Sequence, residues 1–234
     1  MTISSRPAGF APLGRGPAAP LTLLALFAVL ALAGCAKKAD DLTQPIAPAK
    51  PDVGNDATVS MWRSQYEQHK QQWHSEFQGE TSPLPENKRV GTEEPRFYPY
   101  APEWRLVGDL QRLPLQKFDR MPATRGKTQD YLEYGRVPVA ANGDTVSLMV
   151  YRPLDHPEQF FIPFRDATSG DETYGGGRFA HLDSMDVHRW VLDFNNAYNP
   201  YCAYDTMWIC PLPPAENTLP FPVRAGMLAP KGHE

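Results

Sequence analysis

One stretch of aromatic residues in the first third of the chain recurs at the spacing of an amphipathic helix. Trp62, Tyr66, His69, Trp73 and Phe77 follow one another at intervals of 4, 3, 4 and 4 residues. Because an α-helix turns once in about 3.6 residues, this spacing gathers the five side chains on one face. The sequence therefore predicts one long helix ahead of the rest of the domain.

The two ends of this helix are also marked. Asp56, Thr58 or Ser60 can cap its start, because each offers a side-chain oxygen to the free N–H groups of the first turn. The segment TSPLP, Thr81–Pro85, ends it. Its polar face is rich in Gln and Glu rather than in the Lys and Arg of a helix that lies on a membrane surface. We therefore expect the helix to pack on the folded domain.

Beyond Tyr98 the pattern changes to short β-strands. Asn142-Gly143 predicts a two-residue hairpin turn between two apolar-rich runs, because both residues tolerate positive φ. Pro138 implies an edge position or a bulge, because proline has no N–H to donate to a ladder. Further strands are expected at Trp104–Leu113, Leu115–Phe118, Gln159–Arg165, Phe179–Leu182, Trp190–Phe194 and Phe221–Ala225.

These seven or eight short strands follow one another with no helical crossover between them. That order favours a mainly β (α+β) fold, an antiparallel β-barrel or sandwich preceded by one amphipathic N-terminal helix. The composition agrees, since the 25 prolines among 234 residues exceed the typical share of about 5%. Prolines favour turns, loops and edge strands over long helices.

The N-terminus has the pattern of a signal peptide. Arg6 and Arg15 are the only charged residues before Lys37, and a twelve-residue apolar run, Leu21–Leu32, follows them. A spanning helix needs about 20 residues, so this run suits the core of a signal peptide instead. It ends in LAGC, Leu32–Cys35, where small residues are followed at once by a cysteine.

This ending resembles the lipobox of bacterial lipoproteins. The resemblance implies a diacylated Cys35 thiol, cleavage after Gly34 and acylation of the new amino group. Several acyl chains anchor a protein stably, whereas one chain binds a bilayer only marginally. Because Ala36 follows, and not the aspartate linked to inner-membrane retention in enteric bacteria, we expect the outer membrane, facing the periplasm. A plain secretory signal with an incidental cysteine is the alternative.

The sequence thus divides into a lipoprotein signal peptide (1–34), a flexible tether (35–56) and a single β-rich domain (57–234). Removing residues 1–34 takes away two positive charges and no negative ones, so the net charge goes from −4 to −6. The remaining sequence has no cluster of Lys and Arg that would favour binding to nucleic acid. The expected partners are the lipid bilayer, through acylated Cys35, and a small molecule.

The segment FIPFRDATSGDETYGGGRF, Phe161–Phe179, is the densest polar stretch of the chain. Gly170 and Gly175 have the spacing of a P-loop, but Gly176-Gly177 stands where Lys-Ser/Thr is needed. Without the lysine that neutralises phosphate charge, a nucleoside triphosphatase is excluded. An overlapping G-x-G-x-x-A pattern is not followed by a helix, which argues against a dinucleotide site.

Nucleophilic catalysis through Ser169 is a second hypothesis for this segment. His181, His188 and Asp193 follow downstream and could supply a base and the group that orients it. The G-x-S-x-G elbow of many serine hydrolases is absent around Ser169, so only the convergence of these residues in space would support the hypothesis.

The carboxylates of the segment allow two further interpretations. Asp166, Glu172 and Asp193 could provide a pair of acids for glycoside hydrolysis. Alternatively, Arg165 and Arg178 could form ion pairs with Asp166 and Glu172 that hold the loop closed. A buried network of that kind stabilises only if every member is paired, and its role would be structural.

A second dense region, Val191–Asn217, contains several asparagines and two cysteines. With Cys35 lipidated, Cys202 and Cys210 remain as an even pair in an oxidising compartment, so a disulfide is expected. A zinc site would need four ligands, which C-x₇-C alone does not provide. No metal and no other cofactor is expected.

These two regions resemble domain-of-unknown-function family 1684. PFRDATSGDETYGGGRF, then LDFNNAYNPYCAYDTMWICPLPPAEN and VRAGM, match the PFRD-TSG-x-ETY-x-x-GR and DFN-x-AYNP-x-CAY…CPLPP-x-EN blocks of that family. The resemblance covers roughly Met61 to Met227. It places these residues at motif positions: Arg165, Asp166, Thr168, Ser169, Glu172, Thr173, Tyr174, Gly177, Arg178, Asp193, Asn195, Tyr198, Asn199, Cys202, Cys210 and Asn217.

The family has no established activity, so the resemblance implies no reaction. Similar cysteines occur in members that look cytosolic, where thiols usually stay reduced, and this weighs against the disulfide. Our leading hypothesis is a periplasm-facing lipoprotein that binds a small polar or anionic ligand, because arginine forks suit carboxylate and phosphate groups. The alternatives are a hydrolase that uses Ser169 or an Asp/Glu pair, and a structural envelope protein. The candidate pocket comprises Arg165, Asp166, Ser169, Glu172, Tyr174, Arg178, Asp193, Asn195 and Asn199.

Overall fold

The computed structural model describes residues 46–184 and 189–232. The predicted signal peptide, Cys35 and His188 lie outside the described residues. The helix and strands are β1 (Lys50–Pro51), α1 (Asp56–Gln78), β2 (Arg105–Asp109), β3 (Gln111–Arg112), β4 (Phe118–Ala123), β5 (Lys127–Ala141), β6 (Asp144–Pro153), β7 (Phe161–Phe164), β8 (Arg178–Ser184) and β9 (Arg189–Asp193).

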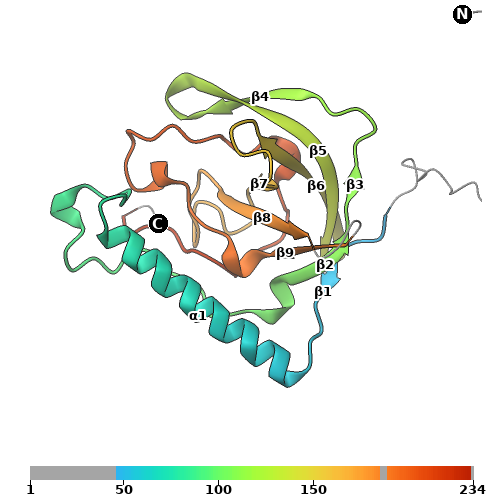
Figure 1. Cartoon of the computed structure of the whole chain (residues 1–234), viewed down its shortest axis with the longest axis horizontal. Helices are drawn as coiled ribbons and strands as arrows, with labels where there is room; N and C mark the ends of the chain where they lie inside the picture. The colour runs from blue at the N-terminus through green and yellow to red at the C-terminus, as the bar shows by residue number, and fades with distance from the viewer. Residues whose placement is uncertain (1–45, 185–188, 233–234) are drawn as a thin grey trace, which may run out of the picture. The chain divides into compact units, whose positions relative to one another are not determined.

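The strands form one antiparallel sheet in the order β1-β2-β9-β8-β7-β6-β5-β3, and β4 pairs with β5 beside β3. The sheet curls into a half-barrel (Figure 1). Its two ends approach each other, because Ala49, just before β1, forms a bridge with Val139 of β5. The predicted mainly β, antiparallel class is therefore confirmed. The structure is neither a sandwich nor a fully paired barrel.

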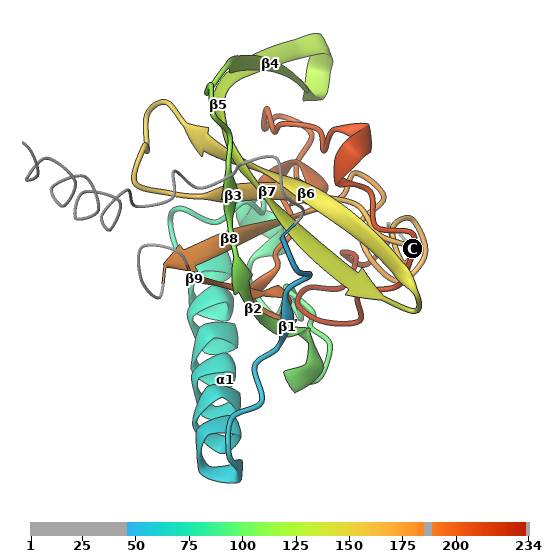
Figure 2. The same cartoon turned by 90° about the vertical axis from the view of Figure 1, so that its right-hand side faces the viewer.

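The hairpin between β5 and β6 is the longest paired element. Asn142 and Gly143 form its turn with φ of 55° and 89°, as predicted. Pro138 lies inside β5, and its carbonyl accepts the Ala49 N–H at 2.8 Å. The N and O of one strand residue point to the same side, so the position of the missing N–H faces away from β6. At one end β4 and β5 extend past the rest of the sheet (Figure 2).

Two of the predicted strands are wrong. Leu115–Phe118 is a strand only at its last residue, where β4 begins. Phe221–Ala225 lies outside the sheet, because Val223 and Ala225 bond the buried side chains of Asp166 and Arg178 instead of a neighbouring strand. The predicted strands at Gln159–Arg165, Phe179–Leu182 and Trp190–Phe194 are confirmed with shifted ends as β7, β8 and β9. Trp104–Leu113 is divided into β2 and β3.

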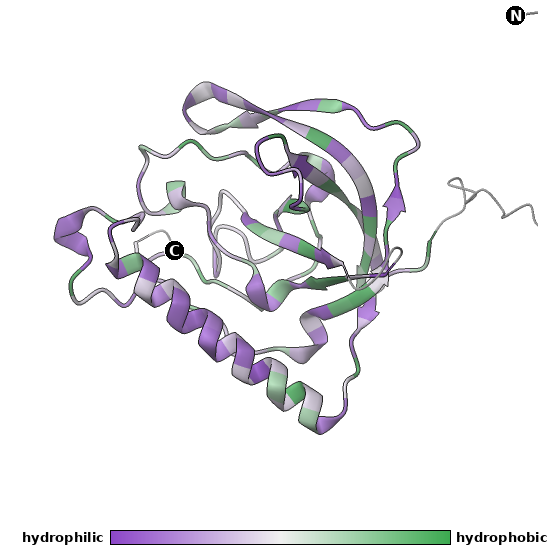
Figure 3. Cartoon of the chain, in the orientation of Figure 1, coloured by the Kyte–Doolittle hydropathy of each residue, from purple (hydrophilic) through white to green (hydrophobic). Residues whose placement is uncertain are grey.

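The core lies inside the curl of the sheet. It includes Val137, Val139, Leu148, Val150, Ile162, Phe164, Ala180, Leu182, Leu192 and Phe194 from the strands and the turn after β9, and Leu219, Phe221, Val223 and Ala225 from the C-terminal segment. Strand colouring in Figure 3 is largely hydrophobic on β8 and β9, while α1 is mostly hydrophilic. The C-terminal segment therefore fills the half-barrel instead of extending it.

Helix α1 packs on the domain, as predicted. Tyr66 and Phe77 are buried, and the Tyr66 hydroxyl donates to the Tyr98 carbonyl at 2.8 Å. The ring of Phe77 meets Tyr204 edge-on, with centroids 4.7 Å apart. Within the described residues, no helix has the length and apolar content needed to cross a bilayer.

The start of α1 corrects two expectations. Asn55 is the N-cap, since its Oδ1 accepts the Thr58 N–H at 2.9 Å. The predicted caps, Asp56, Thr58 or Ser60, are therefore wrong. Lys50–Pro51, which the sequence analysis places in the tether, pairs with β2 as β1. The folded domain thus begins before residue 57.

Candidate functional site

Arg178 and Asp166 form the centre of a buried polar network. Both side chains have 0% exposure, and Arg178 Nη2 lies 3.4 Å from Asp166 Oδ1. The Arg178 guanidinium also donates to the carbonyls of Val223 at 2.8 Å and Ala225 at 2.5 Å. Burial lowers the pKa of Arg178, while the charge of Asp166 opposes that shift. The arginine therefore binds the C-terminal segment and not a ligand.

Asp166 uses its remaining lone pairs on its own loop and on the same segment. It accepts the Val223 N–H at 2.6 Å and the Thr168 hydroxyl at 2.8 Å. The Ser169 hydroxyl donates to Asp166 Oδ1 at 3.2 Å and accepts the Asp166 N–H at 3.1 Å. The described hydrogen bonds of the Ser169 side chain thus go to Asp166, with no histidine or lysine among them, which removes most of the support for a serine nucleophile.

Glu172 and Arg165 lie outside this pair. Glu172 forms a bidentate ion pair with Arg224, with distances from 2.6 to 3.0 Å, and accepts the Tyr98 hydroxyl. The hydrogen bonds from Arg224 lower the pKa of Glu172. Arg165 is half-buried and, among the described residues, has no ion pair. The predicted ion pairing within the loop is present for Asp166 and Arg178. Glu172 instead pairs with Arg224, which the prediction did not include.

The motif asparagines bond to backbone groups. The Asn195 side chain accepts the Ala101 N–H at 2.8 Å and donates to the Ala101 carbonyl at 2.9 Å. Asn199 donates to the Leu228 carbonyl at 2.7 Å. Asn217 accepts the Met149 N–H at 2.7 Å and donates to the carbonyls of Met149 and Pro163, both at 2.9 Å. These amides substitute for missing ladder bonds inside the fold.

Cys202 and Cys210 are free, buried thiols in this structure, so the predicted disulfide is not formed here. The Cys202 N–H donates to Cys210 Sγ at 3.3 Å. The interaction with Cys210 and burial raise the pKa of the Cys202 thiol, whereas Tyr174 opposes that shift. Burial raises the pKa of Tyr174 to about 12.

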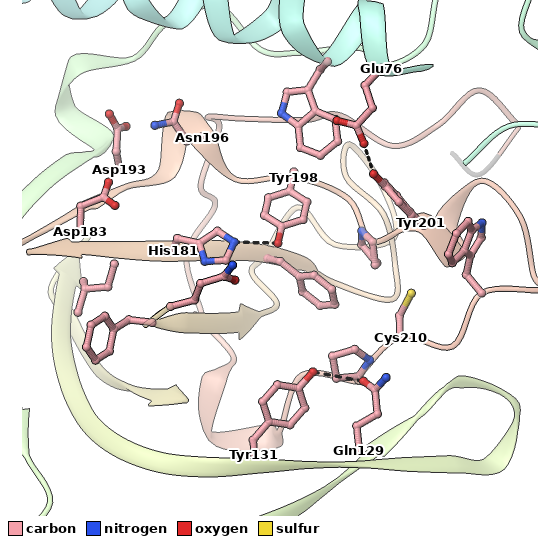
Figure 4. Close-up of a pocket in the computed structure, with 18 of the residues that line it drawn as sticks. Glu76, Gln129, Tyr131, His181, Asp183, Asp193, Asn196, Tyr198, Tyr201 and Cys210 are labelled. Atoms are coloured by element: carbon pink, nitrogen blue, oxygen red, sulfur yellow. Dashed lines mark hydrogen bonds between the residues drawn. The ribbon is translucent and has the colours of Figure 1, made fainter. Parts of the chain in front are cut away.

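A hollow of the described residues lies elsewhere, between α1, β5, β8 and the turns after β9. It has a volume of about 860 Å³. Seven aromatic side chains define it, and we call it the aromatic cavity (Figure 4): Trp73, Tyr131, Phe160, Phe179, Tyr198, Tyr201 and Trp208. Of the nine predicted pocket residues only Asp193 lines this hollow. Cys210, predicted for a disulfide, also lines it.

Tyr198 stands at the middle of the aromatic cavity. Its hydroxyl lies 2.9 Å from His181 Nε2, and the two rings are nearly parallel, at 13°, with centroids 5.6 Å apart. Trp73 covers it from α1, with centroids 5.4 Å apart. Figure 4 shows His181 and Tyr198 next to each other, joined by this hydrogen bond. A ligand in the cavity would therefore contact aromatic rings and the hydrogen-bonded pair of His181 and Tyr198.

The charges around the cavity are negative. Glu76, Glu158, Asp183 and Asp193 line it, and no described lining residue is lysine or arginine. Tyr201 donates to Glu76, and Asp193 pairs with Arg105 at 3.1 Å. Asp183 and Glu158 are exposed at the rim. Glu76 is thus hydrogen-bonded inside the cavity, Asp193 is paired with an arginine outside the lining, and the other two carboxylates are exposed.

Two histidines of the cavity are kept neutral. Burial lowers the pKa of His69 and of His181. The ring of His181 still contacts water, but cavity walls surround it. His69 Nε2 accepts the Trp73 Nε1–H at 2.9 Å, which places the proton of the neutral imidazole on Nδ1. Near pH 7 the histidines therefore add hydrogen-bonding groups without adding positive charge.

Sequence reasoning missed most of this cavity. His69 and Trp73 belonged to the predicted helical stripe, where we interpreted them only as packing residues. His181 appeared as a candidate base for Ser169, which it does not contact among the hydrogen bonds described. The available signal was the excess of aromatic residues in the second motif block, from Tyr198 to Trp208.

Comparisons with known proteins agree with the motif resemblance. A family model described as a protein of unknown function, DUF1684, matches residues 93–227. The solution NMR structure of an uncharacterised protein from Haloarcula marismortui is similar, with a TM-score of 0.60 and 29% sequence identity, over 76% of this chain and 100% of that chain. No curated protein matches the chain. Since the family model spans more than half of its length, this protein belongs to the DUF1684 family.

Proposed function

We propose that the protein binds a small organic cation in the aromatic cavity. The observation that carries the proposal is the combination of seven aromatic side chains and four carboxylates with no described lysine or arginine in the lining. A volume of about 860 Å³ lies within the usual range for small-molecule sites, roughly 300–1,000 Å³.

Aromatic rings attract cations through the negative charge of their faces. A cation over Trp or Tyr gains about 0.5–2 kcal/mol, depending on how far it is desolvated. Trp73 and Tyr198, whose rings pack against each other, both belong to this aromatic lining. A cleft lined by charges of one sign also concentrates ligands of the opposite sign. An amine or quaternary ammonium on a small apolar body fits both features.

The earlier expectation of an anionic ligand depended on Arg165 and Arg178. Arg178 is committed to Asp166 and to backbone carbonyls, and neither arginine lines the aromatic cavity. A carboxylate or phosphate ligand in this cavity would meet acidic side chains instead. We therefore still propose a small polar ligand, but a cation instead of an anion.

Calorimetry and tryptophan fluorescence test this proposal. Choline should bind and change the emission of Trp73 or Trp208, whereas its uncharged carbon isostere, 3,3-dimethyl-1-butanol, and succinate should not. Asp183→Asn should weaken choline binding, because it removes a rim charge, while Asp109→Asn, an exposed acid of β2 outside the cavity, should not. Equal binding of choline and its isostere would contradict the proposal that the cavity recognises the positive charge of its ligand.

We also propose that the domain is anchored in the outer-envelope membrane through acylated Cys35 and faces the periplasm. The support is the apolar run that ends in LAGC. Membrane fractionation of cells that express the full chain tests it. Cys35→Ser should move the protein from the membrane to the soluble fraction, whereas Cys202→Ser should leave it there. Retention of Cys35→Ser in the membrane would overturn this proposal.

A further inference from the structure

Cys210 differs from an ordinary buried cysteine in its hydrogen bonds. Its Sγ accepts the Cys202 N–H at 3.3 Å, and the Cys202 thiol and the Tyr201 backbone also lower the pKa of Cys210. Donors that converge on one sulfur stabilise its thiolate, because they supply partial positive charge without a counter-ion. Cys202 is the opposite case, since the interaction with Cys210 and burial raise the pKa of its thiol.

Cys210 is also accessible from the aromatic cavity. It belongs to the lining, between Ile209 and Pro211, and Figure 4 shows its sulfur directed toward the Tyr201 side. The two cysteines are almost equally buried, with Cys210 7% and Cys202 8% exposed, but only Cys210 belongs to the lining. A small reagent that enters the cavity therefore meets Cys210.

From this arrangement we propose that Cys210 and Cys202 form a thiol–disulfide exchange site, with Cys210 as the attacking and Cys202 as the resolving cysteine. The substrate class is a low-molecular-weight disulfide. This inference does not depend on the binding of a cation.

The chemistry balances in two steps. The Cys210 thiolate attacks one sulfur of the small disulfide, forms a mixed disulfide and releases the other half as a thiolate, which takes up a proton. The Cys202 thiol then loses its proton to solvent and attacks Cys210 Sγ, which releases the second half as a thiol. One small disulfide becomes two thiols, and the protein gains one internal disulfide.

The direction of the pKa shifts agrees with these roles. The hydrogen bond from the Cys202 thiol lowers the pKa of Cys210, and the same bond raises the pKa of Cys202. The attacking cysteine needs the larger thiolate fraction. The resolving cysteine becomes the better nucleophile once the mixed disulfide has formed, because its acceptor is then no longer a thiolate.

The internal disulfide would close a loop on the wall of the aromatic cavity. The residues between the two cysteines include Trp208 and Ile209, which both line it. The exchange therefore converts a loop held by hydrogen bonds into one held by a covalent bond.

The test uses the full chain with Cys35→Ser, reduced and then exposed to oxidised glutathione, with acid quenching and intact mass spectrometry. The chain with both cysteines should end as the internal disulfide, lighter by two hydrogens. Adding Cys202→Ser should trap a glutathione adduct on Cys210. Adding Cys210→Ser should slow the reaction at least several-fold, although Cys202 is still present.

Thermal unfolding checks that both serine variants are folded, and Cys210→Ala replaces Cys210→Ser if the latter is not. In addition, the rate of iodoacetamide labelling of Cys202→Ser against pH should rise at lower pH in the native protein than in urea. Equal reactivity of the two single-cysteine variants would overturn the assignment of roles. A mixed disulfide that never resolves in the two-cysteine chain would overturn the site itself.

Discussion

Arg178 and Asp166 form an ion pair in which neither side chain contacts solvent, with 3.4 Å between Nη2 and Oδ1. The pair lies between β8 and the loop after β7, and its remaining bonds go to Val223 and Ala225. It connects the first motif block to the C-terminal segment that fills the half-barrel. A signature that looks like a ligand site in the sequence is therefore a structural connection in the fold.

Arg178→Met should destabilise the domain by about 3–5 kcal/mol, because it leaves the Asp166 carboxylate buried without its counter-ion. Urea unfolding followed by circular dichroism measures the change. Arg224→Met, which removes the exposed ion pair with Glu172, is the matched control and should have little effect, since exposed pairs contribute little. If Arg178→Met unfolds at the same urea concentration as Arg224→Met, the buried pair does not stabilise the fold.

Gly177→Ala should destabilise the domain more than Gly126→Ala does. Both glycines have positive φ, 92° and 65°, which costs an L-residue about 1–2 kcal/mol. A Cβ at Gly177 would also lie 2.6 Å from the Phe164 carbonyl oxygen, whereas at Gly126 nothing lies within 4 Å. The difference between the two melting temperatures measures the destabilisation caused by the clash of the Cβ at position 177. Equal melting temperatures would contradict that clash.

Asn217→Ala should lower the free energy of unfolding by several kcal/mol. It removes one acceptor and two donor interactions with Met149 and Pro163, and each buried group left unbonded costs about 1–3 kcal/mol. Asn196→Ala, at an exposed asparagine of the same motif block, provides the comparison in the same unfolding experiment. Similar losses for both variants would show that the internal bonds of Asn217 do not matter.

The stability of the domain should fall as the pH drops below about 6.5, the ordinary pKa of histidine. Burial lowers the pKa of His69 in the folded state, so the unfolded chain binds the proton more readily. The contribution of neutral His69 is thus complete above the unfolded pKa and is lost as the pH falls toward the folded pKa. Protonation of Nε2 also breaks the hydrogen bond from Trp73.

His69→Gln should reduce this pH dependence, because glutamine can accept the same bond without titrating. Thermal unfolding between pH 5 and pH 8 measures the slope, and His156→Gln, at an exposed histidine, should leave it unchanged. An identical slope for His69→Gln and the parent chain would contradict the assignment.

The predictions from sequence succeeded where a short stretch of chain contains the information. The aromatic stripe from Trp62 to Phe77 requires a helix whatever surrounds it, because the spacing follows one face. Asn142-Gly143 requires its turn, because few other pairs accept positive φ twice. Asn55 was missed as the cap because three further cap-forming residues follow it.

The candidate site could not be predicted in the same way. The aromatic cavity brings together Trp73 of α1, Tyr131 of β5, His181 of β8 and Tyr201 after β9, which are far apart in the sequence. Their convergence depends on the register of β8 with β9 and on the packing of α1, and neither follows from local patterns. The same limit explains Phe221–Ala225, which has the alternation of a strand but whose carbonyls accept from Arg178 and whose Val223 N–H donates to Asp166.

The sequence by itself determined the helix, the hairpin, the antiparallel β class and, through two motif blocks, the family. These features depend on local periodicity, on turn residues and on residue identities in order. Only the tertiary structure decided that Arg178 faces Asp166 and backbone carbonyls rather than a ligand. It also decided that the open space is aromatic and acidic, because charged side chains acquire their partners only when distant segments pack together.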